Sequence, residues 1–261
     1  MGDVHGVYSW AVRTYECGPD GLATMVSVCN WLQEAASLNA EALSFSKSNF
    51  EAAGENISWV LTRLKVRILR FPKWEEAVSI LTFPRGGRRI VAYRDFVLTG
   101  ADGAELGYAT SEWMLIDLAS RKVVAIPDGV FAAANTVRKP VFGDEPFAKL
   151  RWDCSAASPD ALSFRARRGD IDLNGHVNNV HYVEWLMEGR PGAAGPCQEL
   201  DIVFKSETLA GEEVRVESVE TEPGVFVHRV YAPDGRDHVL ARTSSGAGLR
   251  LEESLWQKII I

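Results

Sequence analysis

The stretch DIDLNGHVNNVHYVEWLME, residues 170–188, says most about the fold of this chain. It places Asp172, Asn174 and His176 at alternate positions immediately before an amphipathic helix. Residues two apart in an extended backbone point to the same side, so we expect these three side chains to face one reaction centre. The amides of the following helix would add positive potential. The stretch therefore predicts acid/base groups, an amide and an anion site in one short segment.

The same order of elements is expected in both halves of the chain. A strand near 8–15 leads into a helix near 20–36, and a strand near 161–167 leads into a helix near 177–188. Strand-like runs follow each helix, at 57–70, 75–83, 88–99 and 105–118 in the first half and at 198–207, 212–221, 224–232 and 237–248 in the second. A long helix followed by an antiparallel meander buries its apolar face on one face of the sheet. The pattern predicts an α+β fold built from two repeats.

A shift of 154 residues aligns the two halves, because it superposes Trp31 on Trp185. Under this shift Asp172, Asn174 and His176 fall opposite Gly18, Asp20 and Leu22. Only the second half has kept the set of polar side chains. If the repeat is real, the carboxyl-terminal half performs the chemistry.

Four segments resemble the acyl-acyl carrier protein thioesterases in the order of that family. They are YSWAVRTYECGPDGLATMVSVCNWLQEAA, RRIVAYRDFVL, ATSEWMLIDLASRKVVAIP and the DxNxHVNN run. The resemblance implies a double hot-dog fold, in which a long helix is wrapped by an antiparallel sheet twice. It also implies an enzyme of fatty acid biosynthesis that releases fatty acids from a phosphopantetheine-linked acyl carrier protein.

Three parts of the chain are expected on this basis. Residues 1–118 would form an amino-terminal hot-dog that holds the acyl chain, and residues 161–261 a catalytic carboxyl-terminal hot-dog. Residues 119–160 contain several prolines and are interpreted as a linker.

The resemblance carries over Asp172, Asn174 and His176 as catalytic residues, and it suggests Glu207 as a fourth. Aligning LDIVFKSET with the corresponding family segment places Thr208 where the family has a cysteine. A cysteine nucleophile is therefore not expected at that position, and hydrolysis driven by a carboxylate is favoured.

The expected roles follow from the chemistry of thioester hydrolysis. Asp172 would activate water or attack the thioester carbonyl itself, and both options stay open. Asn174 would orient the water or carbonyl, His176 would donate to the thioester oxygen or leaving sulfur, and Glu207 would hold His176 or share the base role. Backbone amides near Val177 and Asn178 would complete an oxyanion site.

Structural roles remain open for the same residues. Asp172 and Asn174 are common turn and helix-capping residues. Asn178 and Asn179 are interpreted as the cap and first turn of the helix. His181 follows His176 by five residues, which does not place the two on one metal-binding face.

Composition limits the remaining classes. The 261 residues are 46% hydrophobic, and no run approaches the roughly 18 apolar residues of a membrane span. The chain begins without a signal-like segment, so we expect a cytoplasmic location. The net charge of -7 argues against nonspecific nucleic-acid binding. The spacing of Cys17, Cys29, Cys154 and Cys197 suggests neither zinc nor disulfides, and no metal or cofactor is expected.

Six arginines form two basic segments that could meet an acidic carrier protein or a phosphopantetheine phosphate, or could be ordinary solvated residues. They are Arg85, Arg88, Arg89, Arg165, Arg167 and Arg168. Other functions stay open as well: an acyl-CoA thioesterase or hydratase, and a noncatalytic acyl-binding module. Whether the chain forms a homodimer is left open, because a double hot-dog already contains the pairing that single units make by dimerising.

Overall fold

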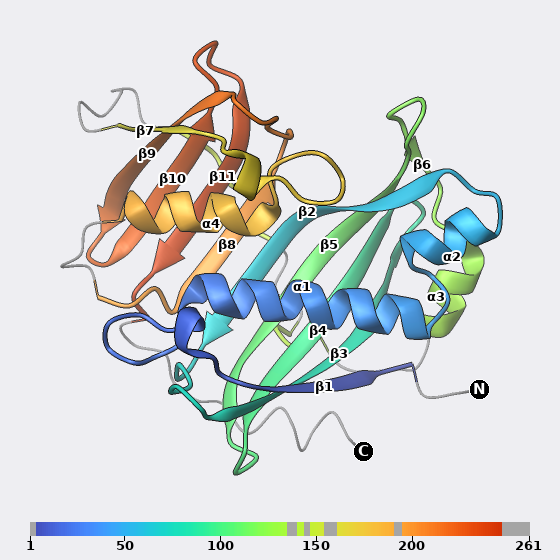
Figure 1. Ribbon diagram of the computed structural model, residues 1–261, viewed down its shortest axis with the longest axis horizontal. Coiled ribbons are helices and arrows are strands. Elements are labelled where there is room, and N and C mark those ends of the chain that lie inside the picture. Colours follow the sequence, from blue (N-terminus) through green and yellow to red (C-terminus); the bar gives the residue numbers. More distant parts are fainter. Residues whose placement is uncertain (1–3, 135–139, 144–146, 154–160, 191–194, 247–261) are drawn as a thin grey trace. The chain divides into compact units, whose positions relative to one another are not determined.

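The computed structural model describes residues 4–134, 140–143, 147–153, 161–190 and 195–246. These residues form two compact units, unit 1 up to residue 143 and unit 2 from residue 147. Each unit places a long helix on one face of an antiparallel sheet, as the double hot-dog prediction requires (Figure 1). Among the described residues, no helix is both long and apolar enough to cross a membrane.

Unit 1 carries its strands in the order β1-β3-β4-β5-β2, with the short β6 beside β5. Its strands are β1 (Gly6–Ala11), β2 (Ile57–Ile68), β3 (Ala77–Arg88), β4 (Val91–Gly100), β5 (Glu105–Asp117) and β6 (Val123–Val124). Its helical elements are the 3-10 turn η1 (Thr14–Glu16), α1 (Met25–Ala42), α2 (Lys47–Ala52) and α3 (Asp128–Ala134). All neighbouring strands are antiparallel, as the meander predicts.

Helix α1 lies across the sheet of unit 1 and buries one apolar face (Figure 1). Val28, Trp31, Leu32 and Ala35 of this face are at most 3% exposed. The helix begins at Met25, where Thr24 accepts a hydrogen bond from the Ser27 amide as the N-cap residue. The sequence-based start near residue 20 is too early, because residues 17–23 form a tight hairpin.

The segment expected to be a linker, residues 119–160, contains β6 and α3. Ile126 and Val130 pack with Phe50, Ala92 and Leu115 in one apolar cluster of unit 1. The prolines of this segment favoured the linker interpretation in the sequence. Burial against the sheet, rather than local propensity, stabilises this short helix.

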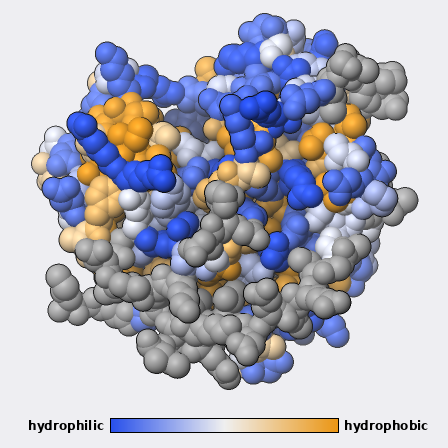
Figure 2. Space-filling model, turned by 180° about the vertical axis from the view of Figure 1, so that it is seen from behind, coloured by the Kyte–Doolittle hydropathy of each residue, from blue (hydrophilic) through white to orange (hydrophobic). Residues whose placement is uncertain are grey.

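The face of the chain drawn in Figure 2 shows hydrophobic areas between hydrophilic ones. Within unit 1, Val141 packs on Leu81, Phe83 and Val97 of the sheet. The amide of Val141 donates to the Asp95 carboxylate at 3.1 Å. Asp95 is fully buried there, so the segment at 140–143 is fixed to the strand by a satisfied hydrogen bond.

Unit 2 repeats the arrangement, with strands in the order β7-β9-β10-β11-β8. Its elements are β7 (Leu162–Arg165), the 3-10 turn η2 (Arg168–Asp170), α4 (Asn179–Glu188), β8 (Glu199–Phe204), β9 (Glu213–Glu222), β10 (Val225–Tyr231) and β11 (Asp237–Ser244). Numbered within each unit, the two strand orders are identical. Helix α4 lies on one face of its sheet and buries Val180, Tyr182, Val183, Trp185 and Leu186 (Figure 1).

The 154-residue repeat is confirmed by backbone hydrogen bonds at the hairpin before each helix. In unit 1, the Gly18 amide donates to Leu22 and the Gly21 amide to Gly18, at 2.8 and 2.9 Å. The corresponding bonds in unit 2 run from Asp172 to His176 and from Gly175 to Asp172, both at 3.0 Å. Isolated β-bridges also recur at the base of both hairpins, as Cys17–Ala23 and Ile171–Val177. The two hairpins have one backbone design but different side chains.

Candidate active site

The residues Asp172, Asn174 and His176 lie on a hairpin of seven residues, 171–177. The expected extended backbone is wrong, because the chain turns between the bridge residues Ile171 and Val177. Gly175 makes this turn possible with a φ of 85°, a conformation that side-chain-bearing residues adopt only with strain. The three residues thus lie on a turn and not on an extended strand.

Asp172 and Asn174 are joined directly. The Asn174 amide donates to Asp172 Oδ1 at 2.7 Å, and Asn174 Nδ2 lies 3.4 Å from Asp172 Oδ2. The first contact is an Asx-type turn, which holds the carboxylate in place over the next two residues. Asn174 is exposed and Asp172 is half-buried, so both can be reached from solvent.

His176 and Glu207 form a second pair. His176 Nε2 lies 3.9 Å from Glu207 Oε2, and their side chains are 29% and 36% exposed. Glu207 follows strand β8, and the next residue fixes its position, because the Val177 amide donates to the Thr208 carbonyl at 2.9 Å. This backbone bond sets the register of the Glu207 loop against the hairpin, which the sequence alignment left uncertain.

The start of α4 corrects the expected oxyanion site. The Val177 amide is used by Thr208 and the Asn178 amide donates to Asp170 O at 2.9 Å. Neither amide is therefore available to an oxyanion in this structure. The other interpretation is confirmed: Asn178 is the N-cap residue, accepting from the Val180 amide at 3.0 Å, and Asn179 begins the helix.

Asn178→Ala is expected to lower the free energy of unfolding by about 1 kcal/mol, since it removes the side-chain acceptor at the N-cap. Urea unfolding of the variant measures this change. Thr24→Ala removes the corresponding cap of α1 and should have a similar effect. An unchanged unfolding midpoint in Asn178→Ala would contradict a stabilising role for this cap.

Thr208, which the sequence alignment places where the family has a cysteine, is completely buried. Its neighbour in the core is Tyr182 of α4, whose pKa is raised by burial to about 12, against the opposing effect of Thr208. A side chain enclosed in this way cannot attack a thioester that arrives from solvent. The position of Thr208 agrees with a structural role.

The described cysteines are also poor candidates for a nucleophile. Cys29 is 1% exposed, and burial raises the pKa of Cys197 to about 12. The pKa of Cys17 is raised by burial and by the carboxylates of Glu16 and Asp20. A raised pKa reduces the thiolate fraction on which nucleophilic attack depends. Cys154 lies outside the described residues.

The six arginines of the basic segments fall into two groups. Arg85 is 3.0 Å from the buried Asp95, and Arg167 is 2.8 Å from the buried Asp170. These two side chains are committed to structural ion pairs. The Arg167 side chain is nevertheless 72% exposed. The remaining four arginines are also exposed: Arg88, Arg89, Arg165 and Arg168.

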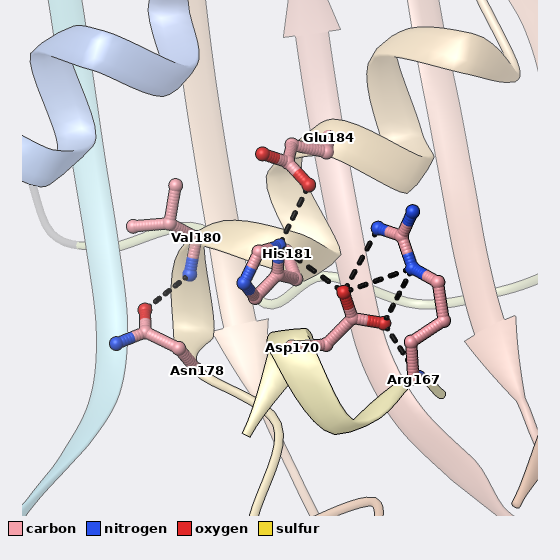
Figure 3. Close-up of polar contacts among 6 residues, drawn as sticks. All are labelled: Arg167, Asp170, Asn178, Val180, His181 and Glu184. Carbon is pink, nitrogen blue, oxygen red and sulfur yellow. Dashed lines mark hydrogen bonds and ion pairs between the residues drawn. The ribbon is translucent and has the colours of Figure 1, made fainter. Parts of the chain in front are cut away.

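A buried carboxylate next to the hairpin was missed by the sequence reasoning. Asp170 is 2% exposed and receives hydrogen bonds from the amide and guanidinium of Arg167 (Figure 3). Burial opposes its ionisation, but the hydrogen bonds from Arg167 and the nearby His181 hold the pKa of Asp170 below its usual value. The repeat contained the signal, because Arg13 and Glu16 stand at the same spacing in unit 1.

No group of three or more histidine, cysteine, aspartate or glutamate side chains comes together as a metal site within the described part of the chain.

The comparisons with known proteins agree with this arrangement in both units. The acyl-ACP thioesterase N-terminal domain model matches residues 5–134, and the corresponding C-terminal domain model matches residues 155–245. The chain belongs to the acyl-ACP thioesterase family. As a member of this family of hydrolases, it has both domains in the family's order.

Individual relatives of this acyl-ACP thioesterase family member are distant. The chain is 26% identical to oleoyl-acyl carrier protein thioesterase 2, chloroplastic, of Arabidopsis thaliana, over 95% of this chain and 75% of that protein. It resembles the solved structure of an acyl-ACP thioesterase from Bacteroides thetaiotaomicron, with a TM-score of 0.84, 23% identity and coverage of 94% and 99% of the two chains. The 12:0-ACP thioesterase from Umbellularia californica gives a TM-score of 0.83 at 23% identity, covering 94% and 98%. At this identity the structural likeness establishes the fold.

Proposed function

We propose that this protein hydrolyses fatty acyl-acyl carrier protein thioesters to free fatty acid and carrier protein, using the hairpin of unit 2. The observation that carries the proposal is the pairing of Asp172 with Asn174 and of His176 with Glu207 on a backbone that unit 1 repeats without these side chains. The family match over both units supports the same reaction class.

The reaction needs a base that activates water, a hydrogen-bond donor to the thioester oxygen and an acid that protonates the leaving sulfur. Asp172, held by the Asn174 amide, takes a proton from water, whose oxygen then attacks the thioester carbon. The C–S bond breaks as the tetrahedral intermediate collapses, and His176 gives a proton to the departing sulfur. Glu207 orients and stabilises the His176 ring at 3.9 Å. Direct attack by Asp172, through an anhydride that water then cleaves, is the alternative with the same residues.

The first expected result is turnover of acyl-carrier protein thioesters without added metal or cofactor. The measurement is release of free fatty acid from a panel of acyl chain lengths, with acyl-CoA of the same lengths assayed in parallel. Better turnover of acyl-CoA would replace the carrier by coenzyme A as the substrate partner. Tight acyl binding without release of fatty acid would instead indicate a noncatalytic acyl-binding module.

Carrier recognition is assigned in this proposal to the exposed arginines, since acyl carrier proteins are acidic. Arg88 and Arg89 end strand β3 and enter a turn in which Ile90 is 45% exposed. A cationic pair beside an exposed apolar side chain can meet both an acidic helix and its apolar edge. Arg165 and Arg168 offer a second cationic pair in unit 2, at the end of β7 and the start of η2.

Reversing the charge of Arg88 and Arg89, or of Arg165 and Arg168, to glutamate is expected to raise KM for acyl-carrier substrate. Short soluble thioesters should be hydrolysed at the original rate, because they need no docking surface. Higher salt should weaken carrier binding in the same way, since the Debye length is ~8 Å at 0.15 M salt. The double change of the exposed Arg236 and Arg242 to glutamate is a matched control for total charge. If all three double variants raise KM equally, a local docking site is wrong.

A further inference from the structure

His181 lies at the junction between the candidate hairpin and helix α4. Its Nδ1 is 2.7 Å from Glu184 Oε2, one turn later on the helix, and 4.0 Å from Asp170 Oδ1 (Figure 3). The ring is 23% exposed, whereas the Asp170 carboxylate is 2% exposed. The ring therefore stands between a buried carboxylate and a solvent-accessible one.

Asp170 connects this ring to the hairpin through its backbone. Its carbonyl accepts the Asn178 amide, and its neighbour Ile171 forms the bridge with Val177 that closes the loop. The carboxylate itself is fixed by Arg167. Any force that holds the Asp170 side chain against α4 thus also fixes the base of the loop that carries Asp172 and His176.

In unit 1, different side chains connect helix α1 to the base of the corresponding hairpin. There the buried Glu16 pairs with Arg13, and Glu16 Oε1 accepts a hydrogen bond from Trp31 Nε1 of α1 at 2.9 Å. Ser27, which corresponds to His181, donates to the Glu16 carbonyl at 2.7 Å. Both donors in unit 1 are neutral. At the place that matches Ser27, unit 2 has the imidazole ring of His181.

We propose that His181 is a positioning residue for the candidate active site, which it serves by fastening helix α4 to the buried Asp170 carboxylate at the base of the hairpin. The inference rests on the proposed function for its kinetic consequence. The charged groups that face the ring are Asp170 from η2, Arg167 beside it, and Glu184 from α4 itself. The contacts with Asp170 and Glu184 place the ring where it joins the start of α4 to the base of the hairpin.

His181→Ala is expected to lower kcat by at least about tenfold, because small displacements of reacting groups are costly, and to leave KM for short thioesters nearly unchanged. His181→Gln keeps a side-chain hydrogen-bond donor that can reach Glu184. It should recover part of the kcat that His181→Ala loses. Ser27→Ala, the matched change in unit 1, should alter neither parameter.

Hydrogen exchange tests the anchor without reference to any activity. His181→Ala should speed exchange of the backbone amides in residues 171–178, while residues 17–24 of unit 1 exchange as before. Unchanged protection of 171–178 in the variant would overturn the proposal, as would a variant with unchanged kcat. If the wild-type protein hydrolyses no acyl thioester, the proposed function fails, but the exchange result still decides whether His181 holds the hairpin.

Discussion

Asp172→Asn should reduce kcat on acyl-carrier thioesters by about 10²- to 10⁴-fold, with the fold intact. The change preserves the shape and the hydrogen bond from the Asn174 amide but removes the charge that would accept a proton or attack the carbonyl. Asn174→Ala and His176→Ala should lose activity over the same range. Steady-state kinetics with free fatty acid as the readout measures kcat, and circular dichroism shows whether each variant keeps its fold.

The hairpin of unit 1 supplies the control for this experiment. Asp20→Ala alters the residue that corresponds to Asn174 on a loop with the same backbone bonds, and it should leave kcat unchanged. Thr208→Ala should also be mild, because this buried side chain takes no part in the proposed chemistry. If Asp20→Ala lost as much activity as Asp172→Asn, the assignment of the chemistry to unit 2 would be wrong.

Substitution of the cysteines tests separately whether a cysteine is the nucleophile. Replacing Cys17, Cys29, Cys154 and Cys197 by serine should preserve most activity if a carboxylate and water do the work. Stoichiometric inactivation by a thiol reagent at one of them, prevented by substrate, would revive a cysteine nucleophile.

Acidification should destabilise the protein through His228 of β10. This side chain is 1% exposed, with Ser218 Oγ at 2.7 Å from Nδ1 and Thr243 Oγ1 at 2.8 Å from Nε2. Burial, with a smaller effect of Arg190, lowers the pKa of His228 to about 3. The folded protein therefore keeps the ring neutral at pH values where the unfolded chain already binds a proton.

The direction of the effect follows from this difference in proton binding. The contribution of the neutral His228 ring to the free energy of unfolding is fully present above the pKa of histidine in the unfolded chain, about 6.5. It is lost as pH falls, by about 1.4 kcal/mol per pH unit and up to about 5 kcal/mol near pH 3. Urea unfolding from pH 7 to pH 4.5 should show this loss in the wild-type protein. His228→Gln should be less stable at pH 7 but should lose less stability on acidification. Parallel curves for the two proteins would mean that His228 does not cause the acid sensitivity. His238, whose pKa is also lowered by burial, is present in both proteins and cancels in the comparison.

Hydrophobic periodicity predicted most of the fold. The meander strands were placed within a few residues, because several of them alternate between buried and more exposed side chains. Helix α1 was expected five residues too early, since the hairpin before it consists of small and polar residues that a periodicity argument extends into the helix. Helices α2 and α3 are short, and only their burial against the sheet reveals them.

The candidate site was predicted by residue identity but not by geometry. The residues Asp172, Asn174 and His176 could be named from the resemblance to the family, yet the turn at Gly175 on which they lie depends on a positive φ. The position of Glu207 depends on a backbone hydrogen bond between Val177 and Thr208, which no sequence pattern encodes. Asp170 was missed because an aspartate is expected on the surface unless its ion-pair partner, here Arg167, is recognised.

The duplicated hairpin is also a scaffold for protein engineering. Gly18→Asp, Asp20→Asn and Leu22→His would transfer the three polar side chains to a loop whose backbone bonds already match. A side chain at Gly18 would first meet the flexible Asp20 carboxylate, at 3.2 Å, rather than main chain. The counterpart of Glu207 would still be absent: the Ala23 amide donates to Pro72 as the Val177 amide does to Thr208, which puts Phe71 in that place. A fourth substitution, at Phe71, would thus be required. The aspartate, asparagine and histidine can be transferred with the hairpin, whereas the glutamate belongs to a separate segment of the chain.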